Sequence, residues 1–265
     1  MDINDAIICI ILISVFPGKI QEANLKKQQL SPSNKIDDPT ATLQTFTLGD
    51  LAQYTKERAY SPQVSSDFHL FYVGRDDVHD ILKHVLSRVT TSLYLNMFGY
   101  DDEELNDIIF ALAVDPSVTV LITLDQNQAG TVHEKKLIAL DQSKDLAAFN
   151  THFVIGQSAT HQISHTKGFV ADGKVGGEGS TNWSTSGEGT FVVKGQPGGA
   201  GYKAQNNTQT IFTDPDSVAR FQAQLIAEHT AAQAAAHSRS GSHAKPHAET
   251  RSGAKGGRAQ ADATE

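Results

Sequence analysis

The chain has 265 residues, which is enough for one large domain or two small ones. Its 22 Lys and Arg against 30 Asp and Glu give a formal net charge of −8, which argues against a protein that coats nucleic acid through bulk positive charge. A single cysteine, Cys9, excludes an internal disulfide and a zinc site built from several cysteines. No apolar run reaches the roughly 18–20 residues that a membrane-spanning helix needs.

Residues 1–20 form an apolar N-terminal segment whose longest apolar run extends from Ala6 to Phe16. The run has the length of a signal-peptide core, but Asp2 and Asp5 precede it where a signal peptide carries Lys or Arg. An atypical export signal, a short membrane anchor and a buried helix or strand all stay open. We expect a periplasmic, secreted or membrane-associated protein if this segment functions, and a cytoplasmic one otherwise.

Two further segments flank the predicted domain. Residues 21–65 are polar and contain turn-forming residues, and they are interpreted as a linker or extension in which Thr47 caps a short helix over Leu48–Arg58. Residues 231–265 are rich in Ala, His, Gly and basic residues and contain no apolar side chain larger than Ala. Such a segment cannot offset its ordering entropy by burial, so we predict a disordered tail. Residues 66–230 remain as the folded domain.

The first part of that domain alternates apolar strands with amphipathic helices. The expected strands are Phe68–Val73, Ser92–Phe98, Val118–Leu124 and Thr151–Ile155. The expected helices follow Asp76-Asp77, cover Asp101–Val114 and cover Val132–Leu140. Val118–Leu124 is almost continuously apolar, which is typical of a strand covered on both faces. The alternation indicates an α/β fold with helices packed on a central sheet.

The pattern changes in the second part. A strand over Ser164–Ala171 is followed by the turn signal Asp172-Gly173 and a returning strand from Lys174, which together predict a hairpin. A further strand is expected over Asn207–Phe212 and a last helix over Ser217–His229.

The hairpin carries the most informative residues. Because side chains alternate along a strand, His165 and Lys167 are expected to point the same way. Ser180 and Asn182, again two residues apart, are expected to share a face on the returning segment. An imidazole, an ammonium, an amide and a hydroxyl would then converge. Phosphodiester transfer needs such a set, namely a nucleophile or base and fixed donors for the phosphoryl oxygens.

The segment from His165 through Asp172 to Asn182 resembles the phospholipase D superfamily signature, H-x-K-x4-D-x6-G-S-x-N, at every defined position. We judge that the resemblance covers about Phe68 to Ala227. It implies a phospholipase D-like mixed β-sheet flanked by helices on both faces, with one catalytic motif per chain.

The resemblance also implies residue roles. His165 is similar to the nucleophile that forms a phosphohistidine intermediate, and Lys167 and Asn182 are similar to the phosphate ligands. Ser180 is expected to support the phosphate pocket. Asp172, at the turn, faces away from His165 and is expected to be structural. No cofactor and no metal ligand are expected.

Members of this family need two motifs, because one histidine attacks phosphorus while the other protonates the leaving oxygen and later activates water. The triplet His133-Glu134-Lys135 has no aspartate or G-S-x-N at the required spacing, and the sequence holds no second copy. Small single-motif members, exemplified by small bacterial endonucleases, solve this as homodimers. The resemblance therefore implies a homodimer in which His165 of the partner subunit is the general acid and base.

The sequence departs from the family pattern at the residue that orients the nucleophile. Small nucleases of the family often carry Ser-Glu-Asn after the motif, whereas Gln205-Asn206-Asn207 has no carboxylate. The Gly-rich insert that follows Trp183 holds Glu188. Three alternatives stay open: Glu188 orients His165, Asn206 orients it, or the support differs from that of the family. Trp183 itself is expected to pack beside the pocket.

The implied function is a metal-independent phosphodiesterase, and within that class an endonuclease that hydrolyses DNA or RNA. From His237 onward the tail has five basic residues against three acidic ones and could add contacts to phosphates. The enzymatic alternative is a phospholipase D that hydrolyses phospholipid head groups and is held at a membrane by residues 1–20. The non-enzymatic alternative is a catalytically silent binding module.

Overall fold

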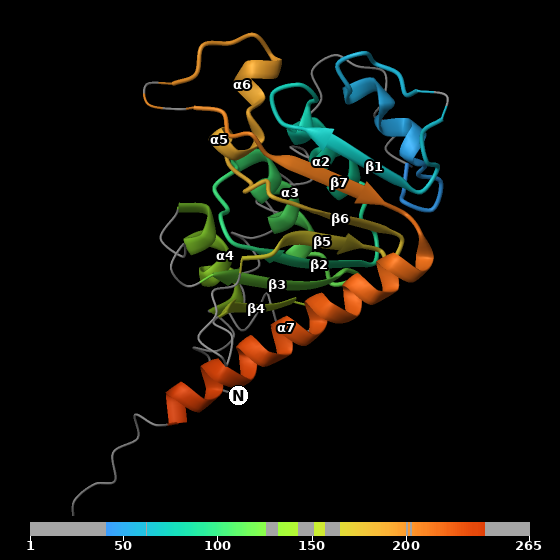
Figure 1. Ribbon diagram of the computed structural model, residues 1–265. Helices are drawn as coiled ribbons and strands as arrows, with labels where there is room; N and C mark the ends of the chain where they lie inside the picture. The colour runs from blue at the N-terminus through green and yellow to red at the C-terminus, as the bar shows by residue number, and fades with distance from the viewer. Residues whose placement is uncertain are drawn as a thin grey trace, which may run out of the picture.

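The computed structural model describes residues 41–61, 63–125, 132–142, 151–156, 165–199, 201 and 203–241. These residues form one seven-stranded mixed sheet with helices on both faces, which confirms the predicted α/β class (Figure 1). Within the described ranges, no helix combines the length and the apolar character that a membrane crossing requires. The apolar segment at residues 1–20 lies outside the described residues.

The strand order in the sheet is β1-β7-β6-β5-β2-β3-β4. Strands β2, β3 and β4 run parallel, whereas each neighbouring pair from β1 to β2 in that order is antiparallel. The bounds are β1 Phe68–Tyr72, β2 Ser92–Met97, β3 Thr119–Asp125, β4 Thr151–Gly156, β5 Lys167–Ala171, β6 Val175–Gly179 and β7 Thr208–Phe212.

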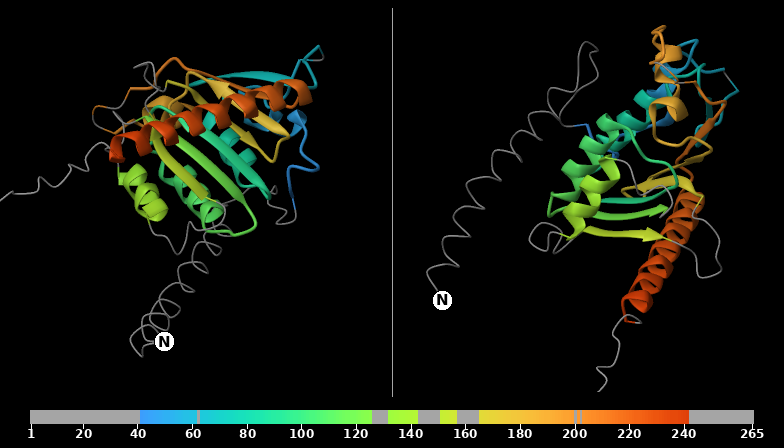
Figure 2. Two further views of the ribbon diagram at one scale, coloured as in Figure 1. Left: turned by 90° about the horizontal axis from the view of Figure 1, so that it is seen from below. Right: turned by 90° about the vertical axis from the view of Figure 1, so that its left-hand side faces the viewer.

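Helix α7 crosses one face of the sheet and contacts β2 to β6, while α2, α3 and α4 lie on the other face (Figure 2). The bounds are η1 Leu48–Tyr54, α2 Val78–Leu86, α3 Glu103–Ala113, α4 Val132–Gln142, α5 Thr185–Glu188, α6 Thr190–Val193 and α7 Pro215–Gly241.

Helices α2 and α4 begin where the sequence predicts, whereas α3 begins two residues after its predicted start and α7 two residues before it. The carboxylates of Asp77 and Asp102 accept hydrogen bonds from the third residue of α2 and of α3, which satisfies backbone donors that have no partner inside the helix. The predicted apolar stripes of both helices are buried against the sheet. On the opposite face, Val218 and Leu225 of α7 pack with Val170 of β5.

The predicted hairpin is confirmed at its turn. Asp172 and Gly173 both have positive φ, 52° and 64°, and Lys174 N donates to the Ala171 carbonyl at 3.0 Å. The Asp172 carboxylate also accepts hydrogen bonds from the backbone N–H groups of three consecutive residues, 90 to 92, and from two threonine hydroxyls among them. Asp172 therefore ties the turn to the start of β2, which is the structural role expected for it.

Two predicted domain boundaries differ from the structure. Leu48 and Leu51 of η1 are buried in the main core, so part of the segment predicted as a polar extension, residues 21–65, belongs to the domain. Helix α7 continues to Gly241, so residues 231–241 are helical and not part of a disordered tail. The prediction weighed only the missing large apolar side chains, whereas alanine is the strongest helix former and can prolong an established helix. Residues 242–265 lie outside the described residues.

Candidate active site

The motif residues lie at one edge of the sheet, where β2 and β6 end and β5 and β7 begin. The register pairs Lys167 with Met97, the last residue of β2, and pairs Gly179, the last residue of β6, with Gln209 near the start of β7. Strand β5 starts at Lys167, later than predicted, so His165 precedes the strand and is exposed. The His165 side chain is therefore accessible from solvent.

His165 and Lys167 share one aromatic ring, that of Phe98. The His165 ring lies 4.7 Å from the Phe98 ring centroid, and the Lys167 ammonium lies 5.0 Å from it. The ammonium also donates to the His165 carbonyl at 2.8 Å. The two side chains thus lie beside the same ring, although His165 precedes β5 and strand alternation does not account for its position. Phe98 itself, just after β2, was not predicted to be part of the site.

Lys167 is a buried cation. It is 4% exposed, burial lowers the pKa of its ammonium, and no carboxylate forms an ion pair with it among the described residues. A buried charge normally has a counterion, because desolvation is costly. An anionic ligand such as a phosphodiester would supply one at this position.

Asn182 lies beside the segment that follows Phe98. The chain around it is held there because Trp183 N donates to the Gly99 carbonyl at 2.9 Å and Asp101 N donates to the Trp183 carbonyl at 2.7 Å. A Cβ on Gly99 would lie 2.9 Å from Asn182 Cγ, so a larger residue there would require the Asn182 side chain to move. The Asn182 Oδ1 is buried without a hydrogen-bond partner among the described residues.

Ser180 does not join the other motif residues. Its exposed hydroxyl donates to Asn207 Oδ1 at 3.2 Å and accepts from Thr208 N at 3.0 Å, so it fixes the end of β6 to the start of β7. The imidazole and the ammonium lie beside the same Phe98 ring, and the Asn182 amide lies beside Gly99. The Ser180 hydroxyl bonds to the start of β7. Trp183 is 1% exposed and packs near Tyr100 and Phe169, which confirms the packing interpretation.

Glu188, one of the two candidates for orienting His165, does not contact it. Its carboxylate accepts a hydrogen bond from His79 Nδ1 at 2.6 Å and is fully buried in α5, so that assignment is wrong. Asn206 is exposed at the surface. Among the described residues, no side chain forms a hydrogen bond with the His165 ring, so the orienting role stays open for Asn206.

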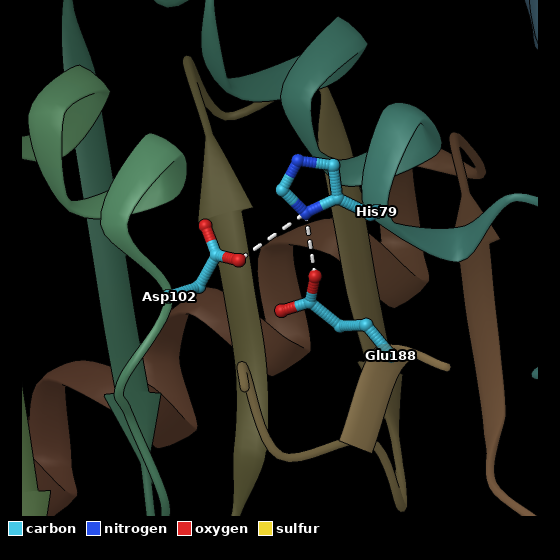
Figure 3. Close-up of side chains that lie close together, drawn as sticks. All are labelled: His79, Asp102 and Glu188. Atoms are coloured by element: carbon cyan, nitrogen blue, oxygen red, sulfur yellow. Dashed lines mark hydrogen bonds and ion pairs between the residues drawn. The ribbon is translucent and has the colours of Figure 1, made fainter. Parts of the chain in front are cut away.

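Sequence reasoning missed a buried ionic cluster formed by His79, Asp102 and Glu188. The three come from α2, the residue before α3, and α5, and both carboxylates are turned toward Nδ1 of His79 (Figure 3). Although burial alone lowers the pKa of His79, hydrogen bonds with the surrounding carboxylates raise it well above its usual range. The sequence offers one weak signal for such a site, a carboxylate within an otherwise polar, Gly-rich insert.

No protein-family model matches the chain, and no curated protein matches it either. Among solved structures, it is similar to Nuc from Salmonella typhimurium, a phospholipase D family member, at 14% identity over 62% of this chain and 94% of that chain, with a TM-score of 0.45. It is similar to NucT from Helicobacter pylori at 16% identity, over 62% and 96% of the two chains, with a TM-score of 0.46.

A third similar structure is the phosphatidylserine synthase of Haemophilus influenzae, at 16% identity over 57% of this chain and 34% of that chain, with a TM-score of 0.41. All three TM-scores lie below 0.5, so they do not establish family membership. The functional assignment rests on the motif residues and their arrangement.

Proposed function

We propose that the protein is a phosphodiesterase of the phospholipase D type that acts through a phosphohistidine on His165. The observation that carries the proposal is the exposed His165 imidazole beside the buried Lys167 ammonium, which has no carboxylate counterion among the described residues. A nucleophile next to an unneutralised cation suits a reaction on an anionic phosphorus centre.

In the first step, a ring nitrogen of His165 attacks phosphorus and the bond from phosphorus to the leaving oxygen breaks. His165 of the partner subunit donates a proton to that oxygen. In the second step, the partner's His165 takes a proton from water, the water oxygen attacks phosphorus, and the bond to the nucleophile breaks. The products are an alcohol and a phosphomonoester, and both imidazoles return to their initial state.

Lys167 and Asn182 stabilise the charge that develops on the phosphoryl oxygens. The ammonium provides a point charge, and the amide NH2 group of Asn182 provides hydrogen-bond donors. Both are held in advance, one by burial on Phe98 and the other by its fit against Gly99. Donors that are fixed before the reaction need no rearrangement as the charge develops.

The proposed substrate is nucleic acid, cleaved internally by a homodimer that combines two motifs. The resemblance to single-motif nucleases supports this choice, and exposure of His165 at the sheet edge leaves space for a polymer. The net charge of −8 predicts weak non-specific affinity for nucleic acid. The decrease in affinity with rising salt concentration should therefore reflect only the few basic residues that contact phosphates.

The decisive assay measures cleavage of labelled single-stranded DNA, double-stranded DNA, RNA and phospholipid vesicles in the presence of EDTA. Wild-type protein is compared with His165→Ala and with His133→Ala, whose H-x-K triplet lacks the rest of the motif. We expect cleavage of a nucleic acid by the wild type and by His133→Ala, and none by His165→Ala. Hydrolysis of phospholipid vesicles without cleavage of any nucleic acid would show that the protein is a phospholipase and not a nuclease.

A trapping experiment tests the intermediate directly. Rapid denaturation of the wild type during turnover of a substrate labelled at phosphorus should leave label on the protein in a form that is stable to base and labile to acid, as expected for phosphohistidine. His165→Ala should carry no label. Full activity of His165→Ala would overturn the proposal, as would activity that disappears within minutes of EDTA addition and returns with Mg²⁺.

A further inference from the structure

The cluster of His79, Asp102 and Glu188 lies outside the proposed catalytic residues and has the form of a ligand set. One ligand atom from each residue lies within 4.8 Å of the other two. His79 Nδ1 is 2.6 Å from Glu188 Oε2 and 3.4 Å from Asp102 Oδ2. We propose that these three residues bind a divalent transition-metal ion of the zinc type, which fixes α5 to α2 and α3.

The imidazole of His79 is oriented as in a metal site. Its Nε2 donates to Glu104 Oε2 at 3.0 Å, and the same oxygen accepts from the Lys83 ammonium at 2.8 Å. Histidines that bind metals nearly always donate their second ring N–H to a carboxylate or carbonyl, which fixes the tautomer. Here that contact leaves Nδ1 as the ligand atom, and Nδ1 faces the other two carboxylates (Figure 3).

The spacing suits tetrahedral coordination. Two ligands bound at about 2.1 Å to a tetrahedral ion lie about 3.4 Å apart, and the Nδ1–Asp102 distance is 3.4 Å. Glu188 Oε2 would move away from Nδ1 by about 0.8 Å to reach the same spacing. The second oxygen of Asp102, Oδ1, caps α3 through Leu105 N at 2.7 Å, so Oδ2 can bind the ion without loss of the cap.

Glu188 supplies an independent indication that a cation belongs here. Its side chain is fully buried, and its Oε1 has no hydrogen-bond partner among the described residues. A buried carboxylate oxygen without a partner is costly, because it has lost its hydration and gained nothing in return. A metal ion bound to the Glu188 carboxylate would supply the positive charge that its buried oxygens lack.

The side chains in direct contact with His79 carry an excess of negative charge. Around His79 the carboxylates of Asp102, Glu104 and Glu188 face the single ammonium of Lys83. With a proton added to Nδ1, these five groups keep one excess negative charge. With a divalent ion in place of that proton, they are neutral. One imidazole with two carboxylates suits zinc and its first-row neighbours better than Mg²⁺ or Ca²⁺, which prefer all-oxygen sites.

The ion would act on structure and not on the reacting phosphorus. Glu188 ends α5, which begins two residues after Trp183, and a Cβ on Gly187 would clash with the carbonyl oxygen of Asn182. Asp102 follows the segment whose backbone bonds to Trp183. A metal that joins these elements would therefore hold the backbone around Asn182 in place.

The test is Zn²⁺ binding by the full chain after removal of bound metal. Calorimetric titration should show one equivalent per chain, and saturating Zn²⁺ should raise the melting temperature as binding to the native state requires. Co²⁺ at the same site should give the visible absorption of a tetrahedral complex. The informative variant is Asp102→Asn, because Asn caps a helix as well as Asp but offers no anionic ligand.

We expect Asp102→Asn to weaken Zn²⁺ binding at least tenfold, and its metal-free melting temperature is measured alongside, because the change also removes the ion pair between Asp102 and His79. The matched control replaces the tail histidines His237, His243 and His247 by Ala, and this variant should bind Zn²⁺ as the wild type does. Absence of the single equivalent in the wild type would overturn the proposal. So would loss of binding in the tail variant with retention in Asp102→Asn, since the ion would then be adventitious.

Discussion

The chain contains two histidine sites with opposite surroundings. His165 is exposed, and its ring has no hydrogen-bond partner among the described residues, whereas His79 is 4% exposed and is hydrogen-bonded to carboxylates through both ring nitrogens. The difference is the one expected between a proposed catalytic histidine, His165, and a structural histidine, His79. A nucleophile has to stay accessible to the substrate atom that it attacks. A buried charged group, in contrast, needs ion pairs and hydrogen bonds within the protein to offset its desolvation.

The strongest test of this contrast is His165→Ala. We expect a loss of turnover of at least about 10³-fold, because His165 is the histidine of the motif and the proposed site of the covalent intermediate. The melting temperature should change little, since an exposed side chain contributes little packing. Turnover and thermal unfolding measured on the same preparation give both quantities. A large fall in the melting temperature would show that His165 resembles His79 after all.

The next largest effect is expected from replacement of Lys167, the cation next to His165. Lys167→Arg should lose about 10²–10³-fold in turnover, because a planar guanidinium does not fit where a compact ammonium sits on Phe98, and one positioned donor is worth about that factor. The measurement is steady-state turnover on the preferred substrate. A variant within twofold of wild type would place Lys167 outside the phosphate pocket.

At the buried cluster the corresponding change is Glu188→Gln, which keeps the shape and removes the charge. We expect a loss of about 3 kcal/mol in the free energy of unfolding, because the His79 imidazolium then loses its shortest ion pair. Denaturant unfolding of metal-free protein measures the effect. An unchanged midpoint would mean that the cluster does not support the fold.

A third histidine, His84, shows how burial acts on an imidazole that is hydrogen-bonded to a tyrosine and not to carboxylates. His84 is as buried as His79 but hydrogen-bonds to Tyr54 OH at 3.0 Å, and burial, together with Arg88, lowers its pKa to about 4. Below about pH 6.5, His84 is therefore protonated in the unfolded chain but stays neutral in the folded chain. Stability from this group should be lost as pH falls from 6.5 toward 4, by up to about 3 kcal/mol. His84→Gln should flatten that part of the pH profile of denaturant unfolding.

The smallest expected effect is the change in activity when wild-type and His165→Ala subunits are mixed in one dimer. If one composite site needs His165 from both subunits, mixing equal amounts of wild type and His165→Ala under free exchange should reduce activity to about one quarter of the wild type. A reduction to one half would instead mean that each chain works alone. Size-exclusion chromatography with light scattering on the same mixtures checks that dimers are present.

The sequence by itself determined those features that depend on short stretches of chain. The Asp172 turn follows from residues that tolerate positive φ, and the proximity of His165 to Lys167 follows from their separation of two residues. The apolar stripe and aspartate cap of α2 are equally local. Each of these depends on neighbours within a few residues, so the pattern alone is sufficient.

Tertiary structure decided what depends on contacts between distant segments. Phe98 joins the site only because β2 pairs with β5 in one particular register, and Glu188 meets His79 across 109 positions of sequence. Ser180 was expected to support the phosphate pocket, and the contacts of its hydroxyl with the start of β7 could not be predicted from the sequence. No local periodicity encodes such pairings, because they depend on the joint packing of the whole sheet and its helices. The motif therefore predicted the chemistry, while the fold determined which side chains support it.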